Sequence, residues 1–437
     1  MRLKFFLLIM MASLFACNSD SDGVFPDPEG GEEPAYIPRE DIALNTIEKQ
    51  LAKKSNTFAF NLLKTVYANE KEHANILLSP LSATLAFSML NNGAAGTTQN
   101  EIQQTLGYVD ASRGDINTFA QKMVNAMQSL DPRGKFESAN SIWIQNGFPV
   151  FNDFKQINQK FYEAEIQNVD FSKPATLTTI NKWCSDKTHG KIPEILEEIN
   201  SLTCLMLINA LYFKGYWTTP FSKDLTTDKL FRASNGVEQK VPTMMKKEIK
   251  AGYTKFENCS ALELPFGNGA FSLVVVLPDE ETTLSTVIEQ MDEAWWNKVV
   301  DFNGFAYEAF LQGHTYLVNL EIPRFKIDYV RTLNTDLMSM GMKTPFDSKA
   351  ADFSLISNLP LWVGLVKQKT FAQMDEEGME AAAVTVIGMM GASGPSKLEV
   401  VQVDFKVNRP FLYFIKEQST GLVFFAGVMN EIKNDIK

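Results

Sequence analysis

The stretch from Asp375 to Pro395 constrains the fold of this chain more than any other part of the sequence. From Glu380 to Ile387 it passes from small to β-branched residues, which favours a strand. From Gly388 to Pro395 it carries only Gly, Met, Ala, Ser and Pro, which is typical of an exposed and cleavable loop. The stretch therefore predicts a strand-forming segment that runs into a protease-sensitive tip. An ordinary loop after a strand is the alternative that these residues alone leave open.

The N-terminus has the pattern of a secretory signal. Met1–Lys4 is positively charged, and the apolar run from Phe5 to Ala16 has 12 residues, too few to span a bilayer. Residues 1–16 are therefore predicted to be a signal peptide. Residues 17–41 contain four prolines, glycines and acidic residues, which predicts a disordered tether. The folded domain is expected to run from 42 to 437.

The sequence Leu14-Phe-Ala-Cys17 resembles a bacterial lipobox, in which the cysteine becomes the lipidated first residue of the mature protein. Phe15 is bulkier than the residue usually found there. The acidic run Asn18–Asp22 resembles the surface-export signal of some Gram-negative lipoproteins. These resemblances imply a protein that is secreted across the inner membrane and anchored through Cys17 at the bacterial outer membrane or cell surface. A plain cleaved signal with an incidental cysteine is the alternative.

Composition narrows the possible classes of function. The formal net charge of −11 argues against nucleic-acid binding by the whole chain. Cys184, Cys204 and Cys259 form no Cys-x-x-Cys pair, which favours buried free thiols over a disulfide framework or a zinc site. The three histidines show no His-Glu-x-x-His spacing, and the chain has no Gly-x-Ser-x-Gly elbow. No metal, cofactor or enzymatic activity is implied, although a hydrolase with a Ser-His-Asp site assembled from distant residues stays open.

Hydrophobic periodicity predicts an α+β fold, because helices and strands mix without regular βαβ alternation. Helices are expected over 42–68, 82–92, 115–130, 151–164 and 180–188, and another is expected to start with a Thr98–Glu101 capping box. Strands are expected over 75–80, 136–144, 166–171, 261–265, 271–277, 316–326, 361–374, 400–407, 411–417 and 421–429, the last two forming a hairpin. The apolar run 202–213 predicts a central strand covered on both faces, in which Asn209 needs partners.

Four motifs occur in order along the predicted domain. They are Asn75-Ile-Leu-Leu-Ser-Pro-Leu-Ser82 with Met89-Leu-Asn-Asn-Gly-Ala-Ala-Gly96, Asn209-Ala-Leu-Tyr-Phe-Lys-Gly-Tyr-Trp217 with Pro220-Phe221, Asp375-Glu-Glu-Gly-Met-Glu-Ala-Ala-Ala383, and Arg409-Pro-Phe-Leu-Tyr-Phe-Ile415 with Thr420-Gly421. Together they resemble the serpins, protease inhibitors whose reactive loop inserts into their own main sheet. The resemblance implies a large mixed main sheet, two further β-sheets, about nine helices and an exposed reactive loop. It also implies a monomer that inhibits a serine protease, or a cysteine protease as the second candidate.

The resemblance implies that four polar residues cluster where the main sheet parts: Ser79, Ser82, Asn209 and Gln368. Such a buried cluster is stable only if its members hydrogen-bond to one another, and it can re-pair when strands separate. The family usually has His where this chain has Gln368, and Gln cannot act as a pH switch. The alternative is that these polar residues are satisfied in place and have no switching role.

The hinge is identified by the same resemblance as Glu376, Glu377, Gly378, Met379, Glu380, Ala381, Ala382 and Ala383. Strand alternation places Met379, Ala381 and Ala383 on one face, together with Thr385 and Ile387. The small residues at 381–383 suit early entry into a sheet. Met379 departs from the Thr that the family prefers, and we expect slower insertion because Met loses rotamer freedom on burial. A non-inhibitory serpin that acts as a binding module is therefore the alternative function.

Counting from Glu376 as the first residue, the family's scissile position is the seventeenth, which is Ala392. The predicted bond is Ala392–Ser393, with Met390 as the second candidate. A small apolar residue suits an elastase-like specificity pocket. Pro323-Arg324 and Glu376 match positions that lie side by side at the top of the family's main sheet, which predicts an ion pair between Arg324 and Glu376.

Overall fold

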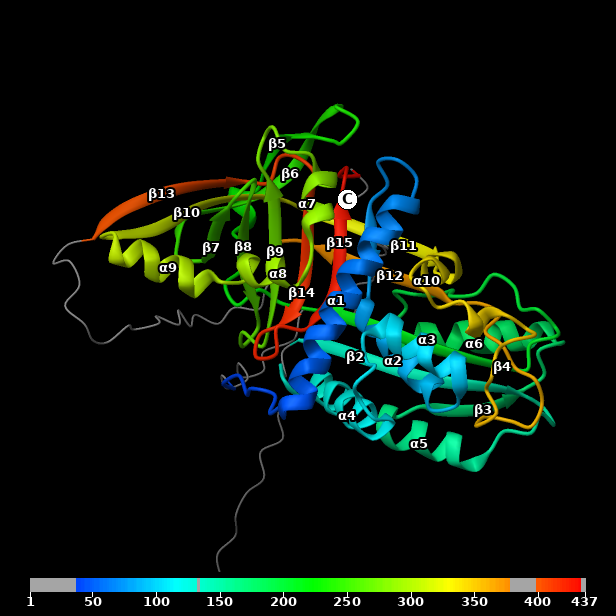
Figure 1. Ribbon diagram of the computed structural model, residues 1–437. Coiled ribbons are helices and arrows are strands. Elements are labelled where there is room, and N and C mark those ends of the chain that lie inside the picture. Colours follow the sequence, from blue (N-terminus) through cyan, green and yellow to red (C-terminus); the bar gives the residue numbers. More distant parts are fainter. Residues whose placement is uncertain (1–36, 132–133, 378–397, 434–437) are drawn as a thin grey trace, which may run out of the picture. The chain divides into compact units, whose positions relative to one another are not determined.

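The described part of the chain, residues 37–131, 134–377 and 398–433 of a computed structural model, contains ten α-helices and fifteen β-strands (Figure 1). The helices are α1 (Thr46–Asn69), α2 (Pro80–Asn91), α3 (Gly96–Leu106), α4 (Arg113–Ser129), α5 (Asn152–Tyr162), α6 (Pro174–Lys187), α7 (Leu284–Gln290), α8 (Glu293–Val299), α9 (Phe302–Leu311) and α10 (Asn334–Ser339). The predicted α+β class is confirmed. None of the helices within these residues is both long and apolar enough to cross a membrane.

The strands form four hydrogen-bonded sheets among the described residues. Their bounds are β1 (Ile76–Leu78), β2 (Lys135–Gln145), β3 (Glu165–Val169), β4 (Leu205–Lys214), β5 (Thr227–Arg232), β6 (Glu238–Ile249), β7 (Gly252–Phe256), β8 (Cys259–Phe266), β9 (Phe271–Pro278), β10 (His314–Pro323), β11 (Phe325–Thr332), β12 (Lys367–Met374), β13 (Glu399–Lys406), β14 (Phe411–Glu417) and β15 (Val423–Met429). Their orders are β1-β15-β14-β9-β8-β7, β13-β10-β6-β5, β3-β2-β4 and β11-β12. All of them belong to one compact unit, Ile37–Lys437.

The six-stranded sheet forms the centre of the hydrophobic core. Every residue of β9, β14 and β15 is buried, as expected for apolar strands that are covered on both faces. Helix α1 packs against β15 (Figure 1). Its Phe60 ring contacts the rings of Trp296 and Phe414. Helix α1 therefore covers part of this buried sheet.

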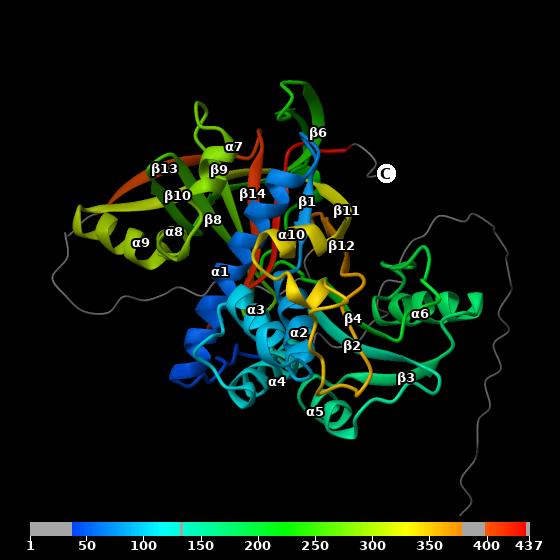
Figure 2. The same ribbon diagram turned by 45° about the vertical axis from the view of Figure 1, so that its right-hand side comes forward.

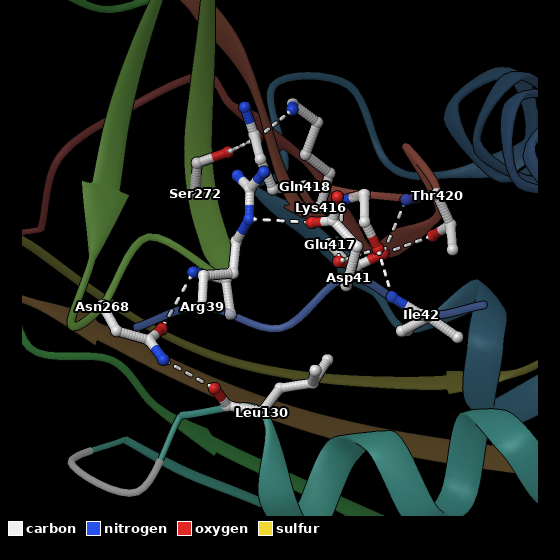
Figure 3. A network of polar contacts seen from close by, with 12 residues as sticks. Arg39, Asp41, Ile42, Leu130, Asn268, Ser272, Lys416, Glu417, Gln418 and Thr420 are labelled. Carbon is white, nitrogen blue, oxygen red and sulfur yellow. Dashed lines mark hydrogen bonds and ion pairs between the residues drawn. The ribbon is translucent and has the colours of Figure 1, made fainter. Parts of the chain in front are cut away.

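The predicted hairpin is confirmed, with β14 and β15 joined through the turn at Gln418–Gly421. The buried carboxylate of Glu417 fixes this turn, because it accepts hydrogen bonds from the backbone N–H and hydroxyl groups of both Ser419 and Thr420 (Figure 3). The backbone N–H of Ile42 donates to the Ser419 hydroxyl. The start of the domain is thereby held on its closing hairpin.

The main sheet is divided into two parts. Strands β3, β2 and β4 form one part, β11 and β12 form the other, and no ladder joins β4 to β12 among the described residues. The prediction of a central strand over 202–213 is therefore wrong in one respect, because β4 is an edge strand. On the side facing β4, β12 forms no ladder, and its hydrogen-bonded partner is β11 on the other side. Helix α6 covers the three-stranded part, and a separate cluster of buried side chains that includes Trp143, Trp183 and Ile208 packs beneath it.

Several local predictions differ from the structure; the strand expected over 361–374, for example, begins only at Lys367, as β12. Helix α3 begins at Gly96, its N-cap Ala95 makes no side-chain cap, and Thr98 is buried inside the helix. The Thr98 hydroxyl instead accepts from the backbone N–H of Asp352. The single strand expected over 316–326 is two strands, β10 and β11, which separate at Arg324 and belong to different sheets. The apolar alternation shifts phase at this break, from Val318, Leu320 and Ile322 to Phe325, Ile327 and Tyr329, and the expected single strand overlooked that shift.

Candidate functional site

The gap between β4 and β12 opens onto an apolar cavity of about 400 Å³. Its walls come from helix α2 (Phe87 and Leu90), from β4 (Leu205 and Leu207) and from the segment before β12, which contributes Val363. The two strands contact each other without forming a ladder. The edge of β4 that faces β12 is therefore open to an additional strand, and apolar side chains of that strand would have a cavity to enter.

The four polar residues expected to cluster are joined across this gap by one chain of hydrogen bonds. Gln368, on β12, accepts from the backbone N–H of Ser79 at 2.9 Å and donates to the Ser79 carbonyl at 2.8 Å. The Ser79 hydroxyl accepts from the backbone N–H of Ser82 at 3.3 Å, and the Ser82 hydroxyl donates to Asn209 on β4. Both serines lie at the N-terminus of α2. The cluster thus links both sides of the gap.

Sequence reasoning missed the continuation of this polar chain. Asn209 donates from Nδ2 to Oδ1 of Asn140 on β2 at 2.7 Å, and Asn140 donates to the Tyr162 carbonyl at 2.7 Å. The Tyr162 hydroxyl donates to Asn117 at 2.8 Å. Asn140 and Tyr162 are buried. An Asn inside an alternating strand was the available signal, but its partner depends on the register between β2 and β4.

The N-terminal end of the predicted reactive loop is anchored at Glu376, two residues after β12 ends at Met374. Arg324 donates from Nε to Glu376 Oε1 at 2.8 Å, and its Nη2 lies 2.6 Å from the same oxygen. The Thr226 hydroxyl donates to that oxygen as well. Burial alone would raise the pKa of Glu376, but the hydrogen bonds from Arg324 and Thr226 hold this pKa below its ordinary value. The carboxylate therefore stays charged with its side chain only 2% exposed.

Trp217 holds the neighbouring residue of the hinge. Its indole N–H donates to the carbonyl of Asp375 at 2.9 Å, and its ring stacks on Phe266 with centroids 4.7 Å apart. Phe221 packs edge-on against Trp217 and lies under the ammonium group of Lys246. Burial lowers the pKa of Lys246 to about 8. Trp217 belongs to a motif seen in the sequence, but its contact with the hinge emerges only in the fold.

The C-terminal end of the loop is held by sheet pairing. Strand β13 runs parallel to β10 over eight residue pairs, from His314–Glu399 to Glu321–Lys406. The backbone N–H of Glu399 donates to the Gly313 carbonyl at 2.8 Å. Both ends of the loop are thus fixed on the fold. The remaining predicted site residues lie outside the described residues: Gly378, Met379, Glu380, Ala381, Ala382, Ala383, Met390, Ala392, Ser393 and Cys17.

The described residues contain no group of three or more His, Cys, Asp or Glu side chains placed to hold a metal ion. Cys184 and Cys259 are buried, and burial raises the pKa of both thiols to about 12. These thiols stay protonated at neutral pH, which disfavours a nucleophilic role.

Fold and site together define a protein with a divided main sheet, in which the residues flanking the predicted loop are held at Glu376 on one side and in β13 on the other. Comparison with known proteins agrees with this class. The family model described as serpin (serine protease inhibitor) matches residues 53–432. The chain therefore belongs to the serpin family.

Individual relatives match over most of their length. Serpin B6 of Pongo abelii is 32% identical over 390 residues, which cover 86% of this chain and 98% of that protein. Leukocyte elastase inhibitor of Homo sapiens is 30% identical over 396 residues, with 87% and 98% covered. The native structure of the thermophilic serpin tengpin is 30% identical, covers 91% of this chain and 97% of tengpin, and superposes with a TM-score of 0.75.

Proposed function

We propose that this chain is a suicide inhibitor of serine proteases that traps the acyl-enzyme by inserting its cut loop between β4 and β12. One observation carries the proposal. β4 and β12 lie next to each other without a ladder, and the predicted loop leaves from the end of β12. A strand added in this gap would join the two parts of the main sheet into one continuous sheet.

The proposed reaction begins as ordinary proteolysis. The protease serine attacks the carbonyl carbon of the scissile residue, the C–N bond breaks, and the departing amine takes up a proton to become a new N-terminus. The remaining half of the loop is then bound to the protease through an ester. It is free to enter the gap, because the cut has released it from β13. Insertion carries the attached protease along the sheet and distorts its active site before water cleaves the ester.

The energetics of insertion follow from the described site. Backbone groups on the open edge of β4 would gain partners, and apolar side chains would leave water for the 400 Å³ cavity. The polar chain from Gln368 to Asn209 must rearrange for the strand to pass, which opposes insertion. The uncut loop is held back at both ends, by the Arg324–Glu376 pair and by β13.

The proposed target is an elastase-like serine protease, with a cysteine protease as the second candidate. The proposed reactive bond is Ala392–Ser393, with Met390 as the second candidate for the scissile residue. A small apolar residue fits a small apolar pocket, and one relative of this chain is a leukocyte elastase inhibitor. No Arg or Lys occurs between Glu376 and Ser396, which disfavours trypsin-like targets.

Gel electrophoresis tests the inhibitor proposal. Residues 37–437 would be mixed with a panel of elastase-like, chymotrypsin-like, subtilisin-like and trypsin-like serine proteases. We expect an SDS-resistant complex with an elastase-like protease and none with a trypsin-like one. Tight binding without cleavage or a stable complex would favour a non-inhibitory binding module. Hydrolysis of peptide substrates by the chain alone would favour a hydrolase.

We also propose that the protein is a lipoprotein of the bacterial outer membrane or cell surface, anchored through Cys17 after removal of residues 1–16. A tethered inhibitor would protect the cell from proteases in its surroundings. Cys17→Ala should release the protein from membranes or block its processing. If that variant is processed normally and stays in the membrane fraction, the anchor proposal is wrong.

A further inference from the structure

Helix α9 lies beside the point where the predicted loop rejoins the fold. The helix ends at Leu311, and Gly313 follows two residues later. The carbonyl of Gly313 accepts from the backbone N–H of Glu399, the first residue of β13. Figures 1 and 2 both show α9 next to β10 and β13. The C-terminal end of α9 and the C-terminal end of the loop are therefore neighbours.

The fold uses only one face of α9. Phe302 and Ala309 are buried, and the Phe305 ring lies 5.5 Å from that of Tyr253 and 5.3 Å from that of Tyr316. These contacts attach the helix to β7 and β10.

The other face of α9 carries two large apolar side chains that this packing leaves exposed. Tyr307 is 50% exposed and Leu311 is 57% exposed. They are four residues apart, so they are neighbours on the helix surface. Single exposed apolar residues are common, and the location of this pair is what makes it informative.

The short C-terminal half of the loop determines where a bound protease must lie. From Ser393 to Leu398 the chain advances five residues, which span at most about 18 Å when fully extended. A protease domain of about 230 residues has a radius of gyration of roughly 17 Å. A protease bound at Ala392–Ser393 would therefore lie within reach of the start of β13, which adjoins the end of α9. The opposite end of the loop, at Glu377, limits the position of the protease much less, because it is three times as many residues from the cut bond as Leu398 is.

We propose that Tyr307 and Leu311 form a docking surface for the target protease, separate from the bond that the protease cuts. The partner surface is an apolar patch beside the active-site cleft. Glu308, next to Tyr307 in the sequence, and Glu399, at the start of β13, are exposed and favour basic residues around that patch. Such a contact adds affinity and selectivity that the uncharged loop tip does not provide. This inference rests on the proposed function and names a second contact with the same partner.

The test measures binding separately from inhibition. The probe is pancreatic elastase whose catalytic serine has been replaced by alanine, so that it binds the loop without cutting it. Tyr307→Ala combined with Leu311→Asp should weaken binding about tenfold, as expected when interface anchors are removed. The matched control is Val109→Asp. Val109 is 56% exposed between α3 and α4, and Figures 1 and 2 place those helices away from α9. Binding of the control should match that of the unaltered chain.

Active elastase then distinguishes failure of the docking surface from failure of the inhibitor proposal. The α9 variant should inhibit more slowly at the same stoichiometry, because insertion itself is unaffected. Equal affinity of all three proteins for inactive elastase would overturn the docking surface, even if inhibition is normal. Cleavage of the unaltered chain without a stable complex would overturn the inhibitor proposal while the binding comparison still stands. A change of oligomeric state in the α9 variant would assign the surface to a second copy and overturn the docking proposal.

Discussion

Arg324 and Glu376 form an ion pair at the end of β12, with Nε and Nη2 of the arginine 2.8 Å and 2.6 Å from one carboxylate oxygen. Arg324 occupies the break between β10 and β11, and Glu376 precedes the predicted loop. The pair therefore joins the base of the loop to the point where two sheets diverge. Its proposed role is to hold the loop in register while the main sheet is divided.

Reversing one charge of this pair should promote polymerisation. Glu376→Lys places two cations side by side, with one in a site where the side chain is only 2% exposed. We expect polymers to form faster on mild heating, and native gel electrophoresis measures the rate. Adding Arg324→Glu should restore the unaltered rate. Glu281→Lys is the matched control, because that side chain is exposed in the loop before α7 and its change should alter the rate little. Additive effects of the 324 and 376 changes would argue against a functional pair.

The same pair predicts a pH dependence. The pKa of Glu376 is lowered in the fold, so the ionised form stabilises the fold at any pH above the ordinary glutamate value of 4.5. That stabilisation is lost as the pH falls through the lowered pKa. Glu376→Gln cannot titrate, so it should be less stable at pH 7, by about 1–3 kcal/mol, and its stability should vary less below pH 4.5. Urea unfolding from pH 3 to 7 measures this, and parallel curves for both proteins would contradict it.

Gln368 should make opening of the gap insensitive to pH near neutrality. The amide accepts from the Ser79 N–H and donates to the Ser79 carbonyl, and it does not titrate. Gln368→His should keep both bonds when neutral but lose the acceptor when protonated, below about pH 6.5. We therefore expect heat-induced polymerisation of the variant, but not of the unaltered chain, to speed up from pH 7.5 to 5.5. Equal pH profiles would show that this bond does not control opening.

Filling the cavity should stabilise the uncut chain and make it a less efficient inhibitor. Ala86 on α2 lines the cavity, and Ala86→Leu adds apolar volume there. We expect the free energy of unfolding of the uncut chain to rise by about 0.5–2 kcal/mol. We also expect a larger fraction of the chains to be cut without trapping the protease, because the filled cavity hinders insertion. Thermal unfolding and inhibition stoichiometry measure the two effects. Ala175→Leu, at an exposed position of α6, is the control. If the Ala86→Leu variant is stabilised but its inhibition stoichiometry is unchanged, insertion does not depend on the cavity.

Local pattern predicted most of the elements because their apolar periodicity is strong. The hairpin β14–β15, helix α1 and β9 lie close to their expected positions. The pairing of the strands could not be predicted from the residues. The run that forms β4 is as apolar as a central strand, yet β4 is the edge strand next to the gap. Its edge position depends on the spacing between β4 and β12, which are about 150 residues apart in the chain and form no ladder.

The candidate site was predictable only as far as family motifs reach. The resemblance named Ser79, Ser82, Asn209 and Gln368, but Asn140 and Tyr162 belong to no motif and join them through strand register and the end of α5. Trp217 was visible as a motif residue, whereas its hydrogen bond to Asp375 crosses 158 positions of sequence. The exposed pair on α9 could not be recognised, because only the fold brings Gly313 to Glu399.

The most direct measurement is the mass spectrum of an elastase reaction, taken together with the inhibition stoichiometry. The chain should yield one C-terminal fragment that begins at Ser393, a covalent complex containing the rest of the chain, and nearly one protease inhibited per chain. A fragment beginning at Gly391 would move the reactive bond to Met390 and keep the mechanism. Cleavage at several positions with full protease activity retained would contradict inhibition by loop insertion.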